Sequence, residues 1–180
     1  LYLLLPFAFI GELTGIGASF LKIPLLIADI AILIALIRLF PQKNKNVIFF
    51  YFLNPIIIYS TYIHSQLDII PTALLFISIY FLTLERIKIS SFFFGFAMAT
   101  KIHVIIALPL ILFYLYKKFN LRAAIKFLVI SSLILFIFDL PFISSEGFIY
   151  MVLLNPKQSL LFDTFYNIGA VKILLPIAAI

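Results

Sequence analysis

The sequence of 180 residues contains no cysteine, which excludes disulfide bonds and thiolate metal sites. Charged residues are also scarce: they make up 11% of the chain, whereas a soluble domain has about 25%. Hydrophobic residues account for 65%, and the mean hydropathy is +1.25. Because a soluble fold cannot hide that much apolar surface, the composition predicts an integral membrane protein.

Several catalytic motifs are absent as well. The sequence has no Gly-rich phosphate loop, HExxH, DxD or GxSxG, so nucleotide-sugar, zinc-protease and serine-hydrolase functions have no local support. The net charge of +6 could suggest nucleic acid, but the basic residues lie in short segments between apolar runs. This pattern is typical of topology signals and of contacts with anionic headgroups. We therefore expect membrane lipid, and no nucleic acid, as a partner.

The apolar runs predict an all-α fold, a polytopic transmembrane helical bundle with roughly seven or eight membrane segments, since one crossing needs about 20 apolar residues. The expected segments are 1–10, 22–39, 47–62, 69–84, a short pair at 91–100 and 104–116, 127–140 and 168–180. The short pair is either two helices that meet near Lys101 or one long broken element. Because the chain starts at Leu1 and ends in an apolar run, we expect residues 1–180 to be part of one transmembrane domain, truncated at both ends.

The turns between these segments predict the orientation. Basic residues cluster in turns that share one side if the helices alternate, and the positive-inside rule places that side in the cytoplasm. These residues are Arg38, Lys43, Lys45, Arg86, Lys88, Lys117, Lys118, Arg122 and Lys126. We therefore expect a multi-pass protein with an extracytoplasmic active face, in the plasma membrane of a prokaryote or the endoplasmic reticulum membrane of a eukaryote.

The segment 141–167 is the longest predicted loop, and it falls on the outer side. Its middle, 148–154, is too short to cross a bilayer and too apolar to lie free in water. We therefore expect an external loop that contains an interfacial or re-entrant helix, which ends at Asn155-Pro156.

The densest polar group on the outer side runs from His64 to Asp68, between two apolar runs. Ionisable groups near membrane depth are costly unless paired or hydrated, which makes them functional candidates. Asp68 directly precedes an apolar run and could be an N-cap, or it could pair with His64 four residues earlier. The Gln66 amide suits a hydroxyl-rich ligand. Alternatively, His64 and Gln66 belong to a solvated loop tip.

A second polar group, Thr100 to His103, interrupts the following apolar stretch. Lys101 and His103 could bind a phosphate group together, whereas an isolated Lys would extend its ammonium to the interface. The preceding small residues, which include Gly95, permit close helix packing.

A third candidate, Asp29, lies among apolar residues two helical turns after Lys22. A carboxylate in this setting is either a functional group or an interhelical hydrogen-bond acceptor, with Asn54 as a plausible partner. The dipeptide Asn54-Pro55 should also kink its helix, because Pro removes a backbone hydrogen bond.

Taken in order, these motifs resemble the GT-C superfamily of integral-membrane glycosyltransferases. The residues that carry the resemblance are Lys22-Ile23-Pro24 with Asp29, Asn54-Pro55, Gln66-Leu67-Asp68 and Phe94 to Lys101. The resemblance covers 12–116 and extends weakly to Asn167. It implies a mannosyl- or glucosyltransferase-like enzyme that moves a hexose or pentose from a polyprenyl-phosphate carrier to a glycan, lipid or protein acceptor. It assigns no metal site and leaves a divalent-metal requirement open.

The resemblance also implies roles for individual residues. Lys101 and His103 would meet the donor phosphate, and His64 and Gln66 would bind substrate. The general base of GT-C enzymes is typically an acid in the first external loop, which would precede Leu1. Within this sequence the catalytic candidates are Glu12, whose surroundings lack the usual acidic motif, and Asp68.

A transporter or flippase for a polar or lipid-linked solute is the alternative. Such proteins place polar groups at the bilayer midplane on broken helices and open to both sides. Asp29, Asn54-Pro55 and the short pair around Lys101 agree in part with that pattern. The one-sided distribution of the other polar residues agrees with it poorly.

Overall fold

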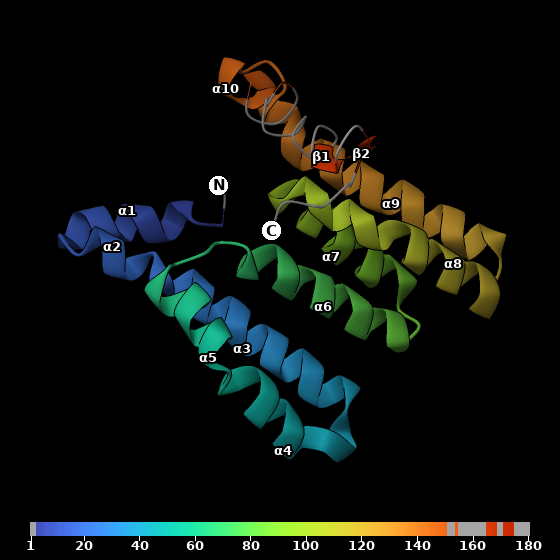
Figure 1. The fold of residues 1–180 in the computed structure, drawn as a ribbon, viewed down its shortest axis with the longest axis horizontal. Helices are drawn as coiled ribbons and strands as arrows, with labels where there is room; N and C mark the ends of the chain where they lie inside the picture. Colours follow the sequence, from blue (N-terminus) through green and yellow to red (C-terminus); the bar gives the residue numbers. More distant parts are fainter. Residues whose placement is uncertain (1–2, 151–153, 155–164, 169–170, 175–180) are drawn as a thin grey trace. The chain divides into compact units, whose positions relative to one another are not determined.

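The computed structural model describes residues 3–150, 154, 165–168 and 171–174. The chain divides into two compact units, Leu1–Phe138 and Asp139–Ile180. The first is all-helical, as predicted. Its α-helices are α1 (Leu5–Thr14), α2 (Gly17–Phe20), α3 (Lys22–Leu39), α4 (Asn44–Val47), α5 (Pro55–Ile58), α6 (Ile69–Thr83), α7 (Ile87–Thr100), α8 (Leu108–Lys118) and α9 (Leu121–Asp139) (Figure 1).

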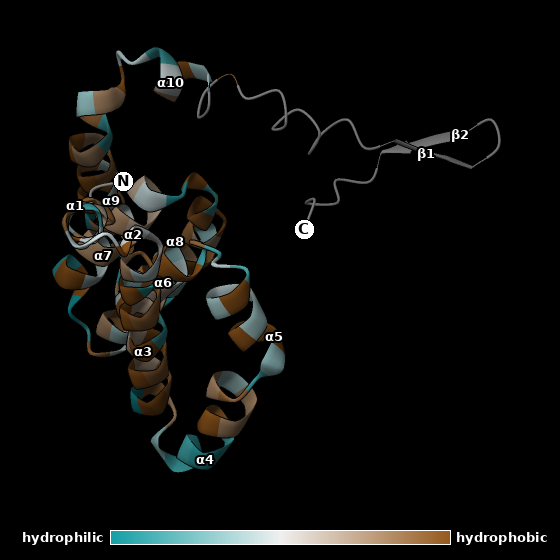
Figure 2. Cartoon of the chain, turned by 90° about the vertical axis from the view of Figure 1, so that its left-hand side faces the viewer, coloured by the Kyte–Doolittle hydropathy of each residue, from teal (hydrophilic) through white to brown (hydrophobic). Residues whose placement is uncertain are grey.

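The α6–α7 hairpin lies at the centre of the first unit. Helix α3 packs against α6 (Figure 1). Helices α8 and α9 contribute buried side chains to the same core as α7. The largest buried side chains of this core include Phe94 of α7, Leu115 of α8 and Phe127 of α9. The rings of Phe94 and Phe127 lie 5.4 Å apart between centroids. Figure 2 shows hydrophobic residues along α3 and α6, and hydrophilic residues at α4.

Small and polar residues bring the central helices close together. At Gly95 of α7, an added Cβ would lie 2.4 Å from the Ser131 backbone oxygen of α9, which confirms the close packing that the sequence predicts there. Ser78 of α6 and Ser90 of α7 each donate a side-chain hydrogen bond to the other's backbone oxygen, at 2.9 and 2.8 Å. These hydrogen bonds set the position of α7 along α6, and with it which residues meet at each end of the hairpin.

The predicted breaks in the helices are present. Asn54 is extended (φ −71°, ψ 119°) and its side-chain oxygen accepts a hydrogen bond from the Ile56 N–H at 2.9 Å, so it caps α5. The 47–62 segment is therefore not one helix: π-helical turns at Ile48–Phe52 and Tyr59–Ile63 flank α5. Lys101 is also extended (φ −156°, ψ 113°), between α7 and a 3-10 segment at Ile102–Ala107 that leads into α8.

The structure does not support a bundle of seven or eight membrane segments. Among the described residues, one helix, Leu121–Phe142, is long and apolar enough to cross a membrane. A second candidate is the pair Lys22–Leu39 and Pro41–Phe52, which is bent by 109°. Helix α6 has 15 residues, and at about 1.5 Å per residue it is shorter than a hydrocarbon core of about 30 Å. The count of apolar runs was too high because it treated segments as short as α6 as full membrane crossings.

The second unit contains a 3-10 turn at Leu140–Phe142 and α10 (Glu146–Phe148), where the Ser145 hydroxyl accepts a hydrogen bond from the Phe148 N–H at 3.2 Å. The interfacial or re-entrant helix predicted at 148–154 stays a prediction, because most of it and its end at Asn155-Pro156 lie outside the described residues. Strands β1 (Phe165–Ile168) and β2 (Val171–Leu174) pair antiparallel. The prediction of a helical segment that starts at Ile168 is therefore wrong, because the β-branched and aromatic residues there pair as strands.

Candidate functional site

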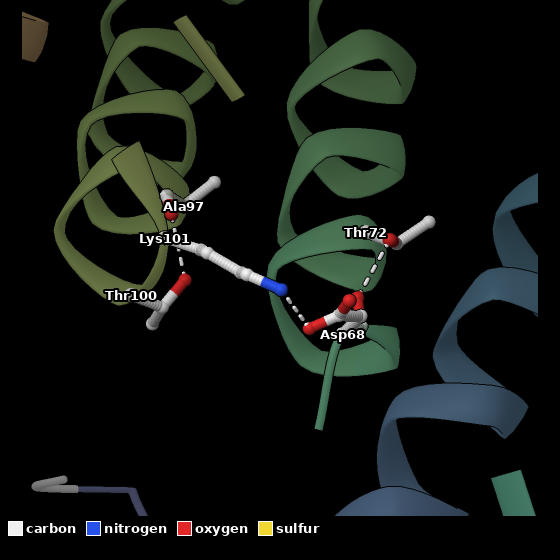
Figure 3. Close-up of polar contacts among 5 residues, drawn as sticks. All are labelled: Asp68, Thr72, Ala97, Thr100 and Lys101. Carbon is white, nitrogen blue, oxygen red and sulfur yellow. Dashed lines mark hydrogen bonds and ion pairs between the residues drawn. The ribbon is translucent and has the colours of Figure 1, made fainter. Parts of the chain in front are cut away.

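Asp68 and Lys101 form an ion pair at one end of the α6–α7 hairpin. Asp68 directly precedes α6 and Lys101 directly follows α7, so the antiparallel packing of the two helices brings them together. The Lys101 ammonium donates a hydrogen bond to Asp68 Oδ1 (Figure 3). Their side chains remain 43% and 54% exposed for Lys101 and Asp68 respectively. The fold thus brings the two groups together and leaves the pair accessible from solvent.

The backbone around this pair is held by two threonines. Thr72 Oγ1 donates to the Asp68 backbone oxygen at 2.7 Å, and Thr100 Oγ1 donates to the Ala97 oxygen at 2.6 Å (Figure 3). Each threonine lies within four residues of the oxygen it contacts, so these bonds are local. They hold the backbone at the helix ends and leave the two charged groups to pair with each other.

The ion pair borders a pocket of about 320 Å³. One wall carries a carboxylate, an ammonium and the Thr100 hydroxyl, and the remainder is apolar. The lining residues are Leu3, Leu4, Leu67, Asp68, Ile70, Pro71, Thr100 and Lys101. Such a mixture fits a ligand that combines a charged or hydroxylated group with a hydrocarbon portion.

Two sequence-based interpretations of Asp68 are wrong. Its side chain makes no capping hydrogen bond to α6, because the carboxylate points to Lys101 instead. It does not pair with His64 either, whose ring stacks on Tyr59 with centroids 6.5 Å apart. The four-residue spacing failed because Ser65 is left-handed (φ 55°). That residue ends the helical path, so His64 and Asp68 do not share a face.

The other predicted site residues are exposed and do not line the pocket. His103 lies in the 3-10 segment two residues after Lys101, and Glu12 lies on α1. The Gln66 N–H donates to the Ser60 oxygen at 3.0 Å, while its side chain is exposed in the loop before α6. Within the described part of the chain, no ion pair holds Glu12 or His103. Of the predicted residues, the structure therefore joins only Asp68 and Lys101.

Asp29 has two tyrosine partners that the sequence analysis missed. Its side chain is 2% exposed, and it accepts hydrogen bonds from Tyr51 at 2.7 Å and Tyr62 at 2.5 Å. Lys22 Nζ donates to the Tyr62 backbone oxygen at 3.3 Å. Asn54 is not the partner, because its amide is engaged at the break before α5. The sequence could have indicated these partners, because a buried carboxylate needs hydrogen-bond donors and the 47–62 segment contains tyrosine hydroxyls.

This Asp29 cluster holds the broken segment 48–63 against α3. Its two hydrogen bonds come from opposite sides of the Asn54 break, one from each π-helical turn. Both carboxylate oxygens are occupied, which leaves the carboxylate satisfied inside the protein. The cluster is therefore assigned a structural role, in agreement with the interhelical alternative for Asp29.

No protein-family model, curated protein or solved structure matches this chain. Among the described residues, no group of three or more His, Asp or Glu side chains lies close enough to hold a metal ion. Function is therefore inferred from the Asp68–Lys101 pocket and from the order of the sequence motifs.

Proposed function

We propose that the chain is part of an integral-membrane glycosyltransferase that moves a hexose or pentose from a polyprenyl-phosphate carrier to a glycan, lipid or protein acceptor. The single observation that carries the proposal is the Asp68–Lys101 pair beside a largely apolar pocket. The order of motifs from Lys22 to Lys101 and its resemblance to GT-C enzymes support the same reading.

Each chemical part of the proposed donor has a suitable group in the lining of the pocket. A polyprenyl-phosphate sugar brings one anionic phosphodiester, a hydrocarbon chain and sugar hydroxyls to the same place. Lys101 supplies the cation for the phosphodiester. Leu67 and Ile70 offer apolar contacts to the first part of the chain, and the Thr100 hydroxyl can bond a sugar or phosphate oxygen.

Asp68 is assigned as the general base. The acceptor oxygen attacks the anomeric carbon as its proton passes to the Asp68 carboxylate, and the bond from that carbon to the phosphate oxygen breaks. The bonding electrons leave with the polyprenyl phosphate, and the anomeric configuration inverts because the acceptor attacks from the face opposite the phosphate. Asp68 is preferred to Glu12 because it lines the pocket and Glu12 does not.

A multi-pass arrangement with the pocket on the extracytoplasmic side is part of this proposal. Helix α9 exposes large apolar side chains such as Leu133 and Phe136, which suits contact with lipid. The basic turns lie at the opposite end of the α6–α7 hairpin from Lys101. Helices as short as α6 and α7 are accommodated in bilayers by local thinning.

A transporter or flippase remains the second candidate because the chain breaks at Asn54 and Lys101, and broken helices are typical of transport sites. The partners of Asp29 count against it. Two tyrosine hydroxyls already occupy this buried carboxylate, whereas a transport site needs a carboxylate that the solute can reach.

The deciding experiment measures sugar transfer in membranes that contain the full-length protein, with radiolabelled polyprenyl-phosphate mannose and glucose as donors. We expect Asp68→Asn to lower the transfer rate by about 100-fold or more, because a general base contributes at least that much. Lys101→Ala should lower both turnover and donor affinity. Lys88→Ala is the matched control: Lys88 is exposed in the first turn of α7, at the other end of that helix, and should transfer at the wild-type rate.

Absence of transfer from every lipid-phosphate sugar, with protein that remains monodisperse in detergent, would reject the enzyme. Uptake or flipping of labelled lipid-linked sugar by reconstituted protein would then support the second candidate.

A further inference from the structure

The two groups that the proposed reaction needs are bound to each other. The Lys101 ammonium, the only cationic side chain in the described lining of the pocket, donates its hydrogen bond to Asp68. A carboxylate engaged in this way is a weaker acceptor for a second proton donor, and the ammonium is partly neutralised toward a phosphate. The resting pocket therefore holds the two groups in an ion pair, which makes Asp68 a weaker base and Lys101 a weaker phosphate ligand than either would be alone.

The ion pair between Asp68 and Lys101 can open at little cost in free energy. Both side chains are about half exposed, and ion pairs of this kind contribute little net stability because water screens them. The Asp68 backbone is held by Thr72 and does not depend on the ion pair. In the described structure, Asp68 has no other side-chain hydrogen bond, so its carboxylate can turn away without breaking a further contact.

We propose that the phosphate of the lipid carrier displaces Asp68 from Lys101, so that the carboxylate is released for the acceptor only after the donor has bound. The inference rests on the proposed function, since it takes the ligand to be a polyprenyl phosphate. The phosphate accepts the hydrogen bond that Asp68 gives up, and the apolar wall at Leu67, Ile70 and Pro71 binds the start of the hydrocarbon chain. The pocket thereby imposes an order, donor first and acceptor second.

Competition for Lys101 has an unusual consequence for mutations. Removing a pocket residue normally weakens ligand binding, whereas removing a competitor strengthens it. Asp68→Asn keeps the size of the side chain and removes the charge that competes with the phosphate. It should therefore bind the lipid phosphate more tightly while it loses transfer activity.

The test measures binding of polyprenyl phosphate to the full-length protein in phosphatidylcholine nanodiscs. We expect Asp68→Asn to bind about 2- to 5-fold more tightly than wild type, the range that corresponds to an exposed ion pair. Lys101→Ala should bind at least about 10-fold more weakly, and adding Asp68→Asn to it should give no further gain. Glu85→Gln, which removes the carboxylate of the ion pair with Lys118, is the matched control and should leave binding unchanged.

Three ligands separate the sources of the effect. Polyprenyl phosphate should discriminate between wild type and Asp68→Asn, and polyprenol without phosphate should not. If inorganic phosphate alone reproduces the full gain and polyprenyl phosphate shows none, the lipid carrier is the wrong ligand and the proposal fails. Thermal unfolding of each variant checks that the affinities refer to folded protein, and Asp68→Ser provides a second removal of the charge.

Unchanged or weaker binding in both Asp68→Asn and Asp68→Ser would overturn the displacement, because Asp68 would then position the ammonium instead of competing for it. This failure differs from failure of the proposed function. Normal sugar transfer by wild type without any gain in these variants rejects the ordered release alone. A gain in binding without transfer from any donor rejects the enzyme and leaves the competition in place.

Discussion

Lys118 Nζ lies 3.2 Å from Glu85 Oε1, which joins the end of α8 to the turn between α6 and α7. Hydrogen bonds from the Lys118 side chain to Tyr114 and Glu85 raise the pKa of its ammonium. The Asp68–Lys101 pair occupies the opposite end of the same hairpin. Two ion pairs thus mark the two ends of the helical unit, and the basic turns at 86–88 and 117–126 belong to the Glu85 end.

This arrangement predicts the sidedness of the chain in a membrane. Because the sequence has no native cysteine, single cysteines can be labelled without background. We expect Gln66→Cys to react with a membrane-impermeant maleimide from the outer side. Gln42→Cys and Lys88→Cys should react only after the membrane is permeabilised, since both lie in exposed segments of the basic end. Labelling of Gln66→Cys and Lys88→Cys from the same side of sealed vesicles would contradict the proposed topology.

The Asp29 cluster predicts that tyrosine hydroxyls stabilise the protein. Tyr51→Phe and Tyr62→Phe each remove one hydrogen bond to the carboxylate and should lower the free energy of unfolding by about 0.5–1.5 kcal/mol. Tyr59→Phe is the control, because Tyr59 is exposed and its ring stacks on His64. Denaturant unfolding in mild detergent measures all three variants. Equal free energies of unfolding for Tyr62→Phe and Tyr59→Phe would show that the hydrogen bond from Tyr62 to Asp29 does not stabilise the protein.

Close packing at Gly95 predicts a large effect from a single methyl group. The new Cβ of Gly95→Ala would meet the Ser131 backbone oxygen and the Ile134 Cβ, at 2.4 and 2.8 Å. Helices α7 and α9 would have to move apart, at a cost of about 1–3 kcal/mol. Gly17→Ala is the control, because its nearest neighbour would be the Gly11 oxygen at 3.8 Å. Thermal unfolding should place Gly95→Ala well below wild type, and a Tm equal to that of Gly17→Ala would refute the close approach.

The serine pair between α6 and α7 predicts energetic coupling. Ser78 and Ser90 are fully buried and exchange hydrogen bonds in both directions. Each single change to alanine should cost about 1 kcal/mol, since it removes a buried hydrogen bond. The double variant should cost less than the two singles together, by about 0.5 kcal/mol or more. Strict additivity in a double-mutant cycle would mean that the two hydroxyls act independently.

Sequence reasoning succeeded where the deciding physics is local. Proline and asparagine at 54–55 predicted a break because proline lacks the N–H that a continuous helix needs, and the chain is broken there. The polar interruption at Lys101 predicted either two short helices or one broken element, and in the structure α7 ends at Thr100 and α8 begins at Leu108 after a 3-10 segment. The small residue Gly95 predicted close packing, and a Cβ there has no room.

Sequence reasoning failed where a polar side chain had several partners to choose from. Spacing along an assumed helix favoured His64 for Asp68, but the left-handed Ser65 removed that helix. Asn54 was a reasonable partner for Asp29 until its amide was used at the break before α5. Tyr51 and Tyr62 were overlooked because only an amide was considered as the donor to Asp29, although tyrosine hydroxyls are donors as well.

The sequence by itself determined that the first unit is helical, that the chain breaks at Asn54-Pro55 and at Lys101, and that basic residues cluster in the turns. These properties follow from composition, proline and hydrophobic runs, which act over a few neighbouring residues. Only the tertiary structure decided that Asp68 meets Lys101 and that Asp29 meets two tyrosines. Those partners lie 22 to 33 residues apart along the chain, and such distances are closed only by the antiparallel packing of α6 on α7 and the folding of the broken segment onto α3.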